Sequence, residues 1–364
     1  MEDFMSKIEI IDFELTSDKK QTKLYKITNK NGASVTLCDY GATVISLMVP
    51  DKFGELRDVV LGYAHIKDYE SRATYFGATI GRCCGRIADG TFEMNHKKYQ
   101  LPVNLKPNHL HGGYEGFSHK MWKAKTTQNG VVFSMKSQDG EEGYPGNMDV
   151  KVTYIFDDTN TLSIQYDAVS DKDTICNMTN HCYFNLNGHD GGSVMGENHL
   201  MWLNCDSYIP LNNQMIPTGE IRSVVGSSFD FTKKKAISSA LSDKNPQVEL
   251  VHGIDHMFVI NRGDEMADCD LALAAQAESK ISGISLKCYT TQKGIHIYTA
   301  NYVYVSPERG KDNCEYKNYP AFCMETQGYP DAVNHKNFPS TILRASDRYH
   351  QETKFVFGVQ NENE

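Results

Sequence analysis

The sequence contains no long apolar run, no CxxC pair of cysteines and no long cluster of basic residues. No apolar run approaches the roughly 20 residues that a membrane-spanning helix needs, and the start, MEDFMSKIEI, lacks the apolar core of a signal peptide. A nucleic-acid groove needs a basic stripe, whereas the formal net charge here is −9. We therefore expect a cytoplasmic protein that binds neither membranes nor nucleic acids.

The ten cysteines are spread along the chain. Cys83 and Cys84 are adjacent, which is poor geometry for a disulfide. Several others lie in strand-like runs, where a free cysteine behaves as a small buried hydrophobic residue. A disulfide framework is therefore not expected, in keeping with a cytoplasmic location.

Alternation of apolar and polar residues is the dominant pattern in the chain. In MDVKVTYIF every second residue from Met148 to Phe156 is apolar, and after the turn DDTN the run TLSIQYDA repeats this from Leu162 to Ala168. Two such runs joined by a turn predict an antiparallel hairpin. Amphipathic helices, repeats and linkers are hard to find. The sequence therefore predicts an all-β antiparallel sandwich in a single domain over residues 1–364.

The segment CDLALAAQAESKI (269–281) is ambiguous. Its alanines and leucines favour a helix by propensity. Leu271, Leu273, Ala275 and Ala277 also fit a period of two, so in an all-β context we predict a strand.

The stretch TNHCYFNLNGH (179–189) combines an apolar face with an unusual polar one. Read at period two, one face carries His181, Tyr183 and Asn185. The opposite face carries Cys182, Phe184 and Leu186. The first face is too polar for a core and too aromatic for an ordinary surface, so it is a candidate wall of a binding site.

Four other stretches place polar residues beside apolar or glycine-rich ones. They are NHLHGG with His109 and His111, FCMETQGYPDAVN with Glu325 and Gln327, GIDHMFVI with Asp255 and His256, and GRCCGRIADG with Arg82 and Arg86. Each has an ordinary interpretation, since a histidine in a strand is usually a structural residue with its hydrogen bonds satisfied. The acidic run DGEEGYPG (139–146) does not fit a calcium loop and is interpreted as a turn.

Taken together, these stretches support two kinds of chemistry. His109 or His111, with His181 and Glu325, would suit a 2-His-1-carboxylate metal site. The same imidazoles and carboxylate would equally suit general acid–base catalysis on a polyhydroxylated substrate. Spacing in the sequence favours neither strongly.

Ordered blocks along nearly the whole chain resemble the aldose 1-epimerase (galactose mutarotase) family. They are GATIGRCCGRIADGTF, NHLHGG, DGEEGYPG, TNHCYFNL, IPTGEI, DHMF, YTTQKGIHIYT and METQGYPDAVNHKNFPSTIL. The resemblance implies a large antiparallel β-supersandwich with few short helices. It also implies interconversion of the α and β anomers of hexoses such as galactose and glucose, with small-molecule aldose sugars as substrates and without cofactor or metal. We expect a monomer or homodimer.

The resemblance also implies roles for single residues. His181 would be the general acid and Glu325 the general base, and His111 would contact the sugar near its ring oxygen. Tyr183 would lie beside the acid on the same face. Sugar hydroxyls would be bound by Arg86, Asp255 and Gln292.

The chain departs from the family pattern in two places. Gly85 stands where the family usually has an asparagine that contributes to the sugar site, which leaves the sugar preference open. The segment SPERGKDNCEYKNYP (306–320) looks longer than usual and is interpreted as a loop near the mouth of the site. Two other functions are considered. A hexose-phosphate 1-epimerase should carry extra cationic residues at its site, and a non-catalytic sugar-binding protein should lack the acid or the base.

Overall fold

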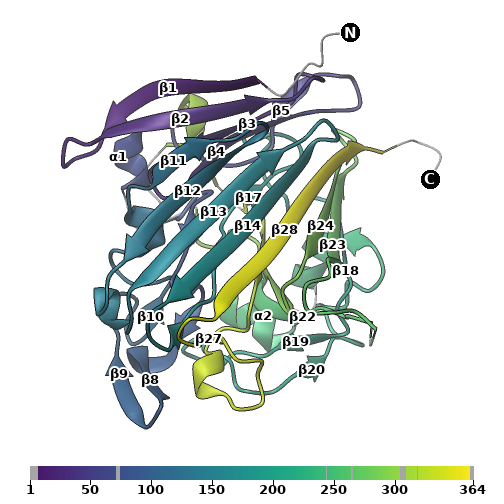
Figure 1. Cartoon of the computed structure of the whole chain (residues 1–364). Helices are drawn as coiled ribbons and strands as arrows, with labels where there is room; N and C mark the ends of the chain where they lie inside the picture. The colour runs from purple at the N-terminus through teal and green to yellow at the C-terminus, as the bar shows by residue number, and fades with distance from the viewer. Residues whose placement is uncertain are drawn as a thin grey trace.

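The computed structural model describes residues 7–70, 74–242, 244–263, 265–303, 309–317 and 319–360. Within these ranges the chain folds into three large β-sheets and several two-stranded ones (Figure 1). The long strands β12 to β14 and β28 cross the front of the molecule in Figure 1. Only two short α-helices occur in the described residues, so the predicted all-β class is confirmed.

The three large sheets have the following strands, given in spatial order. The nine-stranded sheet contains β11 (Lys123–Thr126), β12 (Gly130–Ser137), β13 (Met148–Phe156), β14 (Thr161–Ser170), β28 (Arg348–Val359), β24 (Ile284–Thr290), β23 (Ala272–Ser279), β18 (His199–Leu203) and β21 (Lys235–Ala236). The six-stranded sheet contains β17 (Tyr183–Phe184), β26 (Phe322–Gln327), β25 (Gly294–Tyr298), β22 (Asp255–Val259), β19 (Ser207–Ile209) and β20 (Arg222–Ser223). The five-stranded sheet contains β1 (Lys7–Leu15), β2 (Gln21–Thr28), β3 (Ser34–Cys38), β4 (Thr43–Pro50) and β5 (Leu56–Asp58).

Shorter elements connect these sheets. The two-stranded pairs are β10 (His109–Leu110) with β7 (Arg86–Ile87), β15 (Thr174–Ile175) with β27 (Ile342–Leu343), β16 (Thr179–Asn180) with β6 (Thr79–Ile80), and β8 (Thr91–Met94) with β9 (Lys97–Gln100). The α-helices are α1 (Ile66–Tyr69) and α2 (Pro246–Val251). Single 3₁₀ turns lie at Ala88–Gly90, Phe117–His119, Glu141–Gly143, Lys311–Asn313 and Ala332–Asn334, with a longer one at Ile237–Ser242.

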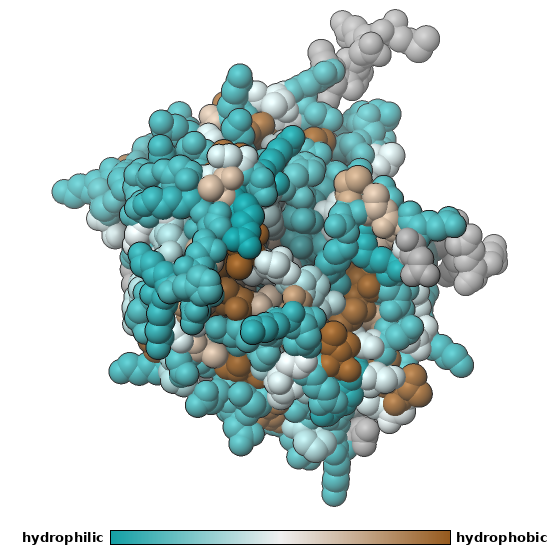
Figure 2. Space-filling model, turned by 60° about the horizontal axis from the view of Figure 1, so that its bottom comes forward, coloured by the Kyte–Doolittle hydropathy of each residue, from teal (hydrophilic) through white to brown (hydrophobic). Residues whose placement is uncertain are grey.

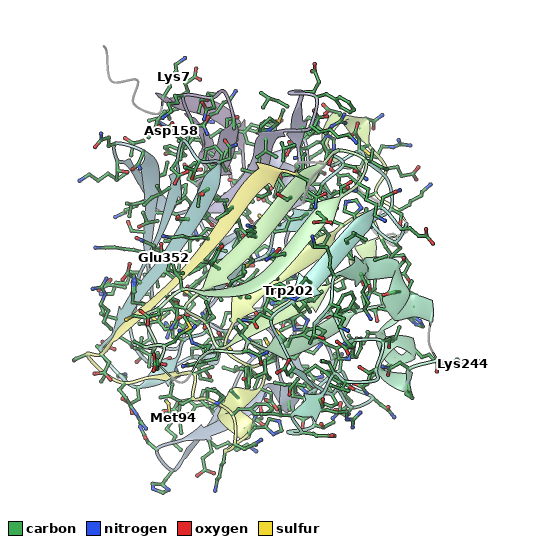
Figure 3. The ribbon with its side chains drawn as sticks, turned by 90° about the vertical axis from the view of Figure 1, so that its right-hand side faces the viewer. Lys7, Met94, Asp158, Trp202, Lys244 and Glu352 are labelled. Atoms are coloured by element: carbon green, nitrogen blue, oxygen red, sulfur yellow. The ribbon has the colours of Figure 1, made fainter. Side chains whose placement is uncertain are left out.

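The predicted hairpin forms the centre of the nine-stranded sheet. Strands β13 and β14 pair from Met148↔Ser170 to Phe156↔Leu162, and the apolar residues predicted to share a face are buried. They pack in one core with Ile297 of β25, so the nine-stranded and six-stranded sheets form the two layers of a sandwich. Figure 3 shows the molecule from the side, with Trp202 on β18 and Glu352 on β28.

The ambiguous segment 269–281 is a strand, as predicted, but its alternation is not continuous. Strand β23 has a register irregularity between Leu273 and Ala275, so Ala274 and Ala275 are both buried in the core while Leu273 is partly exposed. A bulge of this kind inserts one extra residue and changes which residues face inward. The prediction that Leu273 and Ala275 share a face is therefore wrong.

The polar run 179–189 is also less regular than predicted. It contains two short strands, β16 and β17, with His181 and Cys182 between them. Cys182, Phe184 and Leu186 enter the main core, as the alternation predicted. Asn185 does not join the polar face of His181 and Tyr183; it is buried, and its amide donates to the backbone carbonyls of Gly192 and Pro320.

The described part of segment 306–320 is fixed to the body of the protein, whereas residues 306–308 and 318 lie outside the described residues. Lys311 is buried, and its Nζ donates to Asp58 Oδ2 at 2.6 Å and to the carbonyls of Ile45 and Val60. Tyr316 is buried nearby, with its hydroxyl on the carbonyl of Gly62. A buried ammonium with three acceptors fixes this part of the segment.

None of the helices in the described residues is long and apolar enough to cross a membrane. Figure 2 turns the lower side of the molecule forward and shows apolar residues grouped near the centre of a surface that is otherwise mostly polar.

Candidate functional site

Three neighbouring strands of the six-stranded sheet form one wall of a cavity of about 510 Å³. Strands β22, β25 and β26 pair in the registers Asp255↔Tyr298 and His296↔Glu325. Because side chains alternate along a strand, these residues face the cavity together, while their neighbours face the core. The neighbours in the core include Ile295, Ile297 and Met324. The alternation seen in the sequence thus places the polar residues of these strands on one side.

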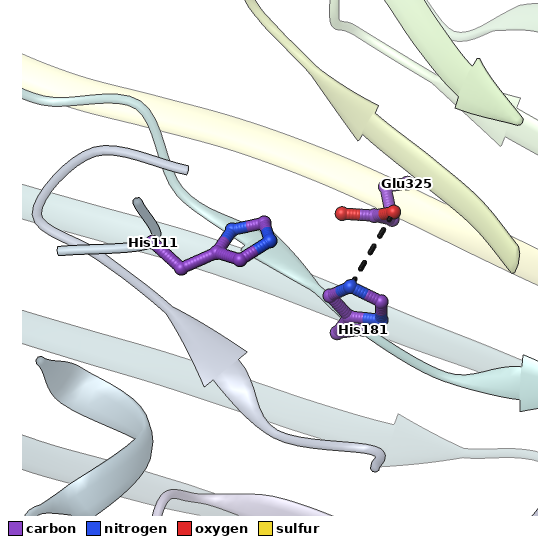
Figure 4. Close-up of side chains that lie close together, drawn as sticks. All are labelled: His111, His181 and Glu325. Carbon is purple, nitrogen blue, oxygen red and sulfur yellow. Dashed lines mark ion pairs between the residues drawn. The ribbon is translucent and has the colours of Figure 1, made fainter. Parts of the chain in front are cut away.

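His181 lies opposite Glu325, and its imidazole Nε2 is 3.6 Å from Glu325 Oε1 (Figure 4). The two side chains are only 5% and 4% exposed. The ring of His181 lies nearly parallel to the rings of two tyrosines. Tyr183 lies 4.9 Å away at 16° and Tyr75 lies 6.2 Å away at 21°. Tyr75 has φ 57°, which is unusual for a bulky residue.

The second ring nitrogen of His181 contacts a thiol. Its Nδ1 is 3.8 Å from Cys323 Sγ. Burial, together with the charge of Glu325, raises the pKa of the Cys323 thiol well above its ordinary value, so the sulfur keeps its hydrogen. The thiol can donate to Nδ1 of the neutral ring, and its sulfur can accept from the imidazolium. When the thiol donates to Nδ1, the hydrogen of the neutral ring is on Nε2, which faces Glu325.

His111 has a fixed orientation in the same cluster. Its backbone φ of 49° ends the extended stretch at β10, so it does not share a face with His109 as predicted. The backbone N–H of Gly85 donates to His111 Nδ1 at 3.2 Å. Burial and the positive charges of His181 and Arg86 hold the pKa of His111 well below its ordinary value. The ring is therefore neutral, with its hydrogen on Nε2.

His111, His181 and Glu325 form what we call the imidazole–carboxylate cluster. Their ligand atoms lie within 4.8 Å of one another, a spacing that invites comparison with a metal site. A histidine that binds a metal normally donates its other N–H to an acceptor. Here the other nitrogen of His111 faces an N–H donor, that of Gly85. The cluster therefore fits a hydrogen-bond donor at His111 better than a metal ligand.

A second polar group lies beside this cluster. Asp255 Oδ1 is 2.7 Å from His296 Nε2, and Asp255 Oδ2 is 3.9 Å from a guanidinium nitrogen of Arg86. Burial alone would raise the pKa of Asp255, but the hydrogen bond from His296 and the charge of Arg86 outweigh burial and hold this pKa below its usual range. Asp255 is therefore ionised and presents a carboxylate at the cavity.

The structure thus brings together most of the residues predicted for the site. His111, His181, Glu325, Arg86, Gly85, Tyr183 and Asp255 all line the cavity. Gln292 is not among the described residues that line it; its amide donates to the Tyr349 hydroxyl at 3.2 Å. Gln327 does line the cavity, on the face that it was predicted to share with Glu325.

The other polar residues singled out in the sequence are structural. His109 is buried and contacts the Tyr144 hydroxyl and the carbonyl of Pro102. The guanidinium of Arg82 is buried and donates to backbone carbonyls of the turn between β12 and β13. His256 is buried against Phe229, on the opposite side of β22 from Asp255. The HxH pattern is therefore not a metal-binding pair.

Sequence reasoning missed several residues that line the cavity, among them Tyr75, His296 and Tyr298. The last two had a detectable signal, because GIHIY alternates and places His296 and Tyr298 opposite Ile295 and Ile297. Tyr75 had none, since it enters the site through its unusual backbone conformation.

Known proteins resemble this chain along most of its length. A family model described as aldose 1-epimerase matches residues 23–356. Human galactose mutarotase is 39% identical over 325 residues, which cover 89% of this chain and 91% of the relative. The aldose 1-epimerase of Haemophilus influenzae is 37% identical over 338 residues, covering 92% and 95%. A solved aldose epimerase homologue from C. elegans has a TM-score of 0.83 at 30% identity, covering 98% and 100%. The predicted galactose mutarotase-like fold is therefore confirmed.

Proposed function

Because the chain belongs to the aldose 1-epimerase family, whose members are isomerases that act on sugars, we propose that His181 and Glu325 interconvert the anomers of a free hexose in this cavity. Galactose and glucose are the expected substrates. Arg86, Asp255 and Tyr183 would contact the sugar, and His111 would lie near its ring oxygen. Gln292 remains a predicted contact that would need a rearrangement of the side chain, because its amide is directed at Tyr349.

The proposed reaction requires only proton transfers. The Glu325 carboxylate removes the proton of the C1 hydroxyl, and the His181 imidazolium gives its Nε2 proton to the ring oxygen, so the C1–O5 bond breaks and an aldehyde forms. Rotation about C1–C2 presents the other face of the aldehyde. On closure the O5 hydroxyl returns its proton to His181 as it attacks C1, and the carboxyl of Glu325 reprotonates the oxygen. The neutral His111 donates a hydrogen bond from Nε2 to the oxygen that carries the developing charge.

The observation that carries this proposal is the convergence of His181 Nε2 and Glu325 Oε1, 3.6 Å apart in a cavity that also holds Arg86 and Asp255. At this distance the two groups are near each other without a hydrogen bond that would have to be broken first. Polarimetry on freshly dissolved α-D-galactose and α-D-glucose tests the proposal. A rate no faster than spontaneous mutarotation would overturn it.

Two alternatives were considered from the sequence. A hexose-phosphate 1-epimerase needs extra cations, and Arg86 is the only lysine or arginine among the described residues that line the cavity. A non-catalytic sugar-binding protein would lack the acid or the base, whereas both converge here. A monomer or homodimer in the cytoplasm remains our expectation, and size-exclusion chromatography with light scattering would test the oligomeric state.

A further inference from the structure

Arg86 and Asp255 are opposite charges that do not form a close pair. The nearest guanidinium nitrogen and carboxylate oxygen are 3.9 Å apart, and the side chains are only 16% and 11% exposed. In a site with so little water the attraction between such charges is strong. An unrestrained arginine and carboxylate usually meet at ~2.7–2.9 Å, often through two parallel hydrogen bonds. Something in the site must therefore hold these two groups apart.

His296 is placed to do this. It lies on β25 between Asp255 on β22 and Glu325 on β26, and its Nε2 is 2.7 Å from Asp255 Oδ1. One carboxylate oxygen is thereby occupied on the side of His296. The other, Oδ2, faces Arg86 from beyond hydrogen-bonding distance. A closer pairing with Arg86 would require the carboxylate to move, and the 2.7 Å hydrogen bond to His296 opposes that movement.

The guanidinium of Arg86 has few competing acceptors. Among the described residues, the side-chain hydrogen bond found for it goes to the sulfur of Met215 at 3.6 Å, and a thioether is a weak acceptor. Most of its five N–H donors are therefore still available. The same holds for the lone pairs of Asp255 Oδ2. Donors and acceptors in this state match the vicinal hydroxyl groups of a pyranose, which can donate and accept at once.

We propose that His296 is a positioning residue that holds Asp255 away from Arg86, so that both charges stay available to sugar hydroxyls. The identity of the ligand as a sugar rests on the proposed function. The separation of Arg86 and Asp255 by His296 does not depend on that function. The ring's other nitrogen supports it. His296 Nδ1 is buried and lacks a partner among the described residues, so the hydrogen bond to Asp255 is the polar contact that holds the ring.

The test compares His296→Phe with His296→Gln. Phenylalanine retains a flat ring and removes the donor, whereas the glutamine amide can still donate to Asp255. The ligand is 1,5-anhydrogalactitol, which keeps the ring and the hydroxyls at C2, C3, C4 and C6 but cannot mutarotate, and its affinity is measured by calorimetry. We expect His296→Phe to weaken binding about tenfold or more, and His296→Gln to stay within about threefold of wild type, as suits loss and recovery of hydrogen bonds to charged groups.

A double-mutant cycle separates positioning from direct contact. If His296 acts through Asp255, then His296→Phe should cost little further affinity in an Asp255→Asn background. His199→Phe is the matched control, because His199 is a buried imidazole whose Nδ1 likewise lacks a partner in the part of the chain that the structure describes. It should lower the melting temperature and leave the affinity for 1,5-anhydrogalactitol unchanged.

Two results would overturn the proposal. One is unchanged affinity in His296→Phe, and the other is a crystal structure of unliganded His296→Phe in which Arg86 and Asp255 stay near 3.9 Å apart. Failure of the proposed function looks different. In that case the wild-type protein would not accelerate mutarotation, whereas the shortened Arg86–Asp255 distance in the variant crystal would still be observed.

Discussion

Replacing Glu325 by glutamine is the sharpest test of the proposed chemistry. Glu325 is 3% exposed and lies at the centre of β26, so an amide of the same shape should be accommodated without a change of fold. The variant cannot accept a proton from the C1 hydroxyl. Another carboxylate in the cavity, Asp255, is held by His296 and therefore is a poor substitute.

The expected loss of rate is large because, among the described residues that line the cavity, no other carboxylate is placed to replace Glu325. A positioned base contributes ~10²–10⁴-fold to a rate, so kcat should fall by at least about 100-fold, or about 2.7 kcal/mol in the barrier. Affinity for the sugar should stay within about tenfold, because the hydroxyl contacts expected at Arg86 and Asp255 are not altered. The substitution does not alter Cys323, Thr326 or the packing of the core, so the melting temperature should be nearly unchanged.

Polarimetry on fresh α-D-galactose, corrected for spontaneous mutarotation, gives kcat and KM. Calorimetry with 1,5-anhydrogalactitol gives the affinity independently. Glu352→Gln is the matched control, since this carboxylate lies on the nine-stranded sheet outside the cavity lining. It should leave both quantities unchanged. A Glu325→Gln enzyme with a wild-type rate would refute the role of Glu325 as the base.

Three further predictions concern the same site. His181→Asn should lower kcat by about 100-fold or more with little change in melting temperature. His111→Asn should affect both kcat and KM. A stable and fast His181→Asn enzyme would leave His111 as the candidate acid. Dialysis against EDTA should leave the polarimetric rate intact, because Nδ1 of His111 faces an N–H donor; loss of the rate and its recovery with a divalent metal would contradict this. Gly85→Asn should change the galactose-to-glucose ratio of kcat/KM more than kcat itself. Gly85 has φ 75°, so the asparagine adds backbone strain, and Pro330, 3.0 Å from the added Cβ, has to shift. An unchanged ratio would mean that a neighbouring group already supplies the contact.

Much of this architecture could be predicted because strands leave a simple pattern. The alternation in 148–168 gave the hairpin and its buried face, and the same period gave the shared face of Glu325 and Gln327. The bulge in β23 could not be predicted, since nothing in LALAA distinguishes the extra residue. That residues 1–364 form one domain stays a prediction.

The site was predicted less completely than the fold. His111 and Tyr75 take positive φ values, and period-two reasoning assumes an extended backbone, so it paired His111 with His109 and gave no place to Tyr75. The resemblance to a family supplied the roles of His181 and Glu325, which the residues alone left open between metal binding and proton transfer. The alternation of GIHIY could have placed His296 on the polar face of its strand. Its role was missed because that role depends on a contact with Asp255 on a neighbouring strand.

The shared register of β22, β25 and β26 has a consequence for how this enzyme can misfold. A slip of one residue in β26 would exchange the two faces of this strand. Met324 would then face the cavity, and the carboxylate of Glu325 would have to enter the apolar core. Burying an unpaired charge there costs several kcal/mol, comparable with much of the stability of a typical domain. A slipped molecule should therefore unfold rather than persist as a well-folded but inactive species. Activity per folded molecule should accordingly stay constant across preparations, and refolding yield and catalytic yield should rise and fall together.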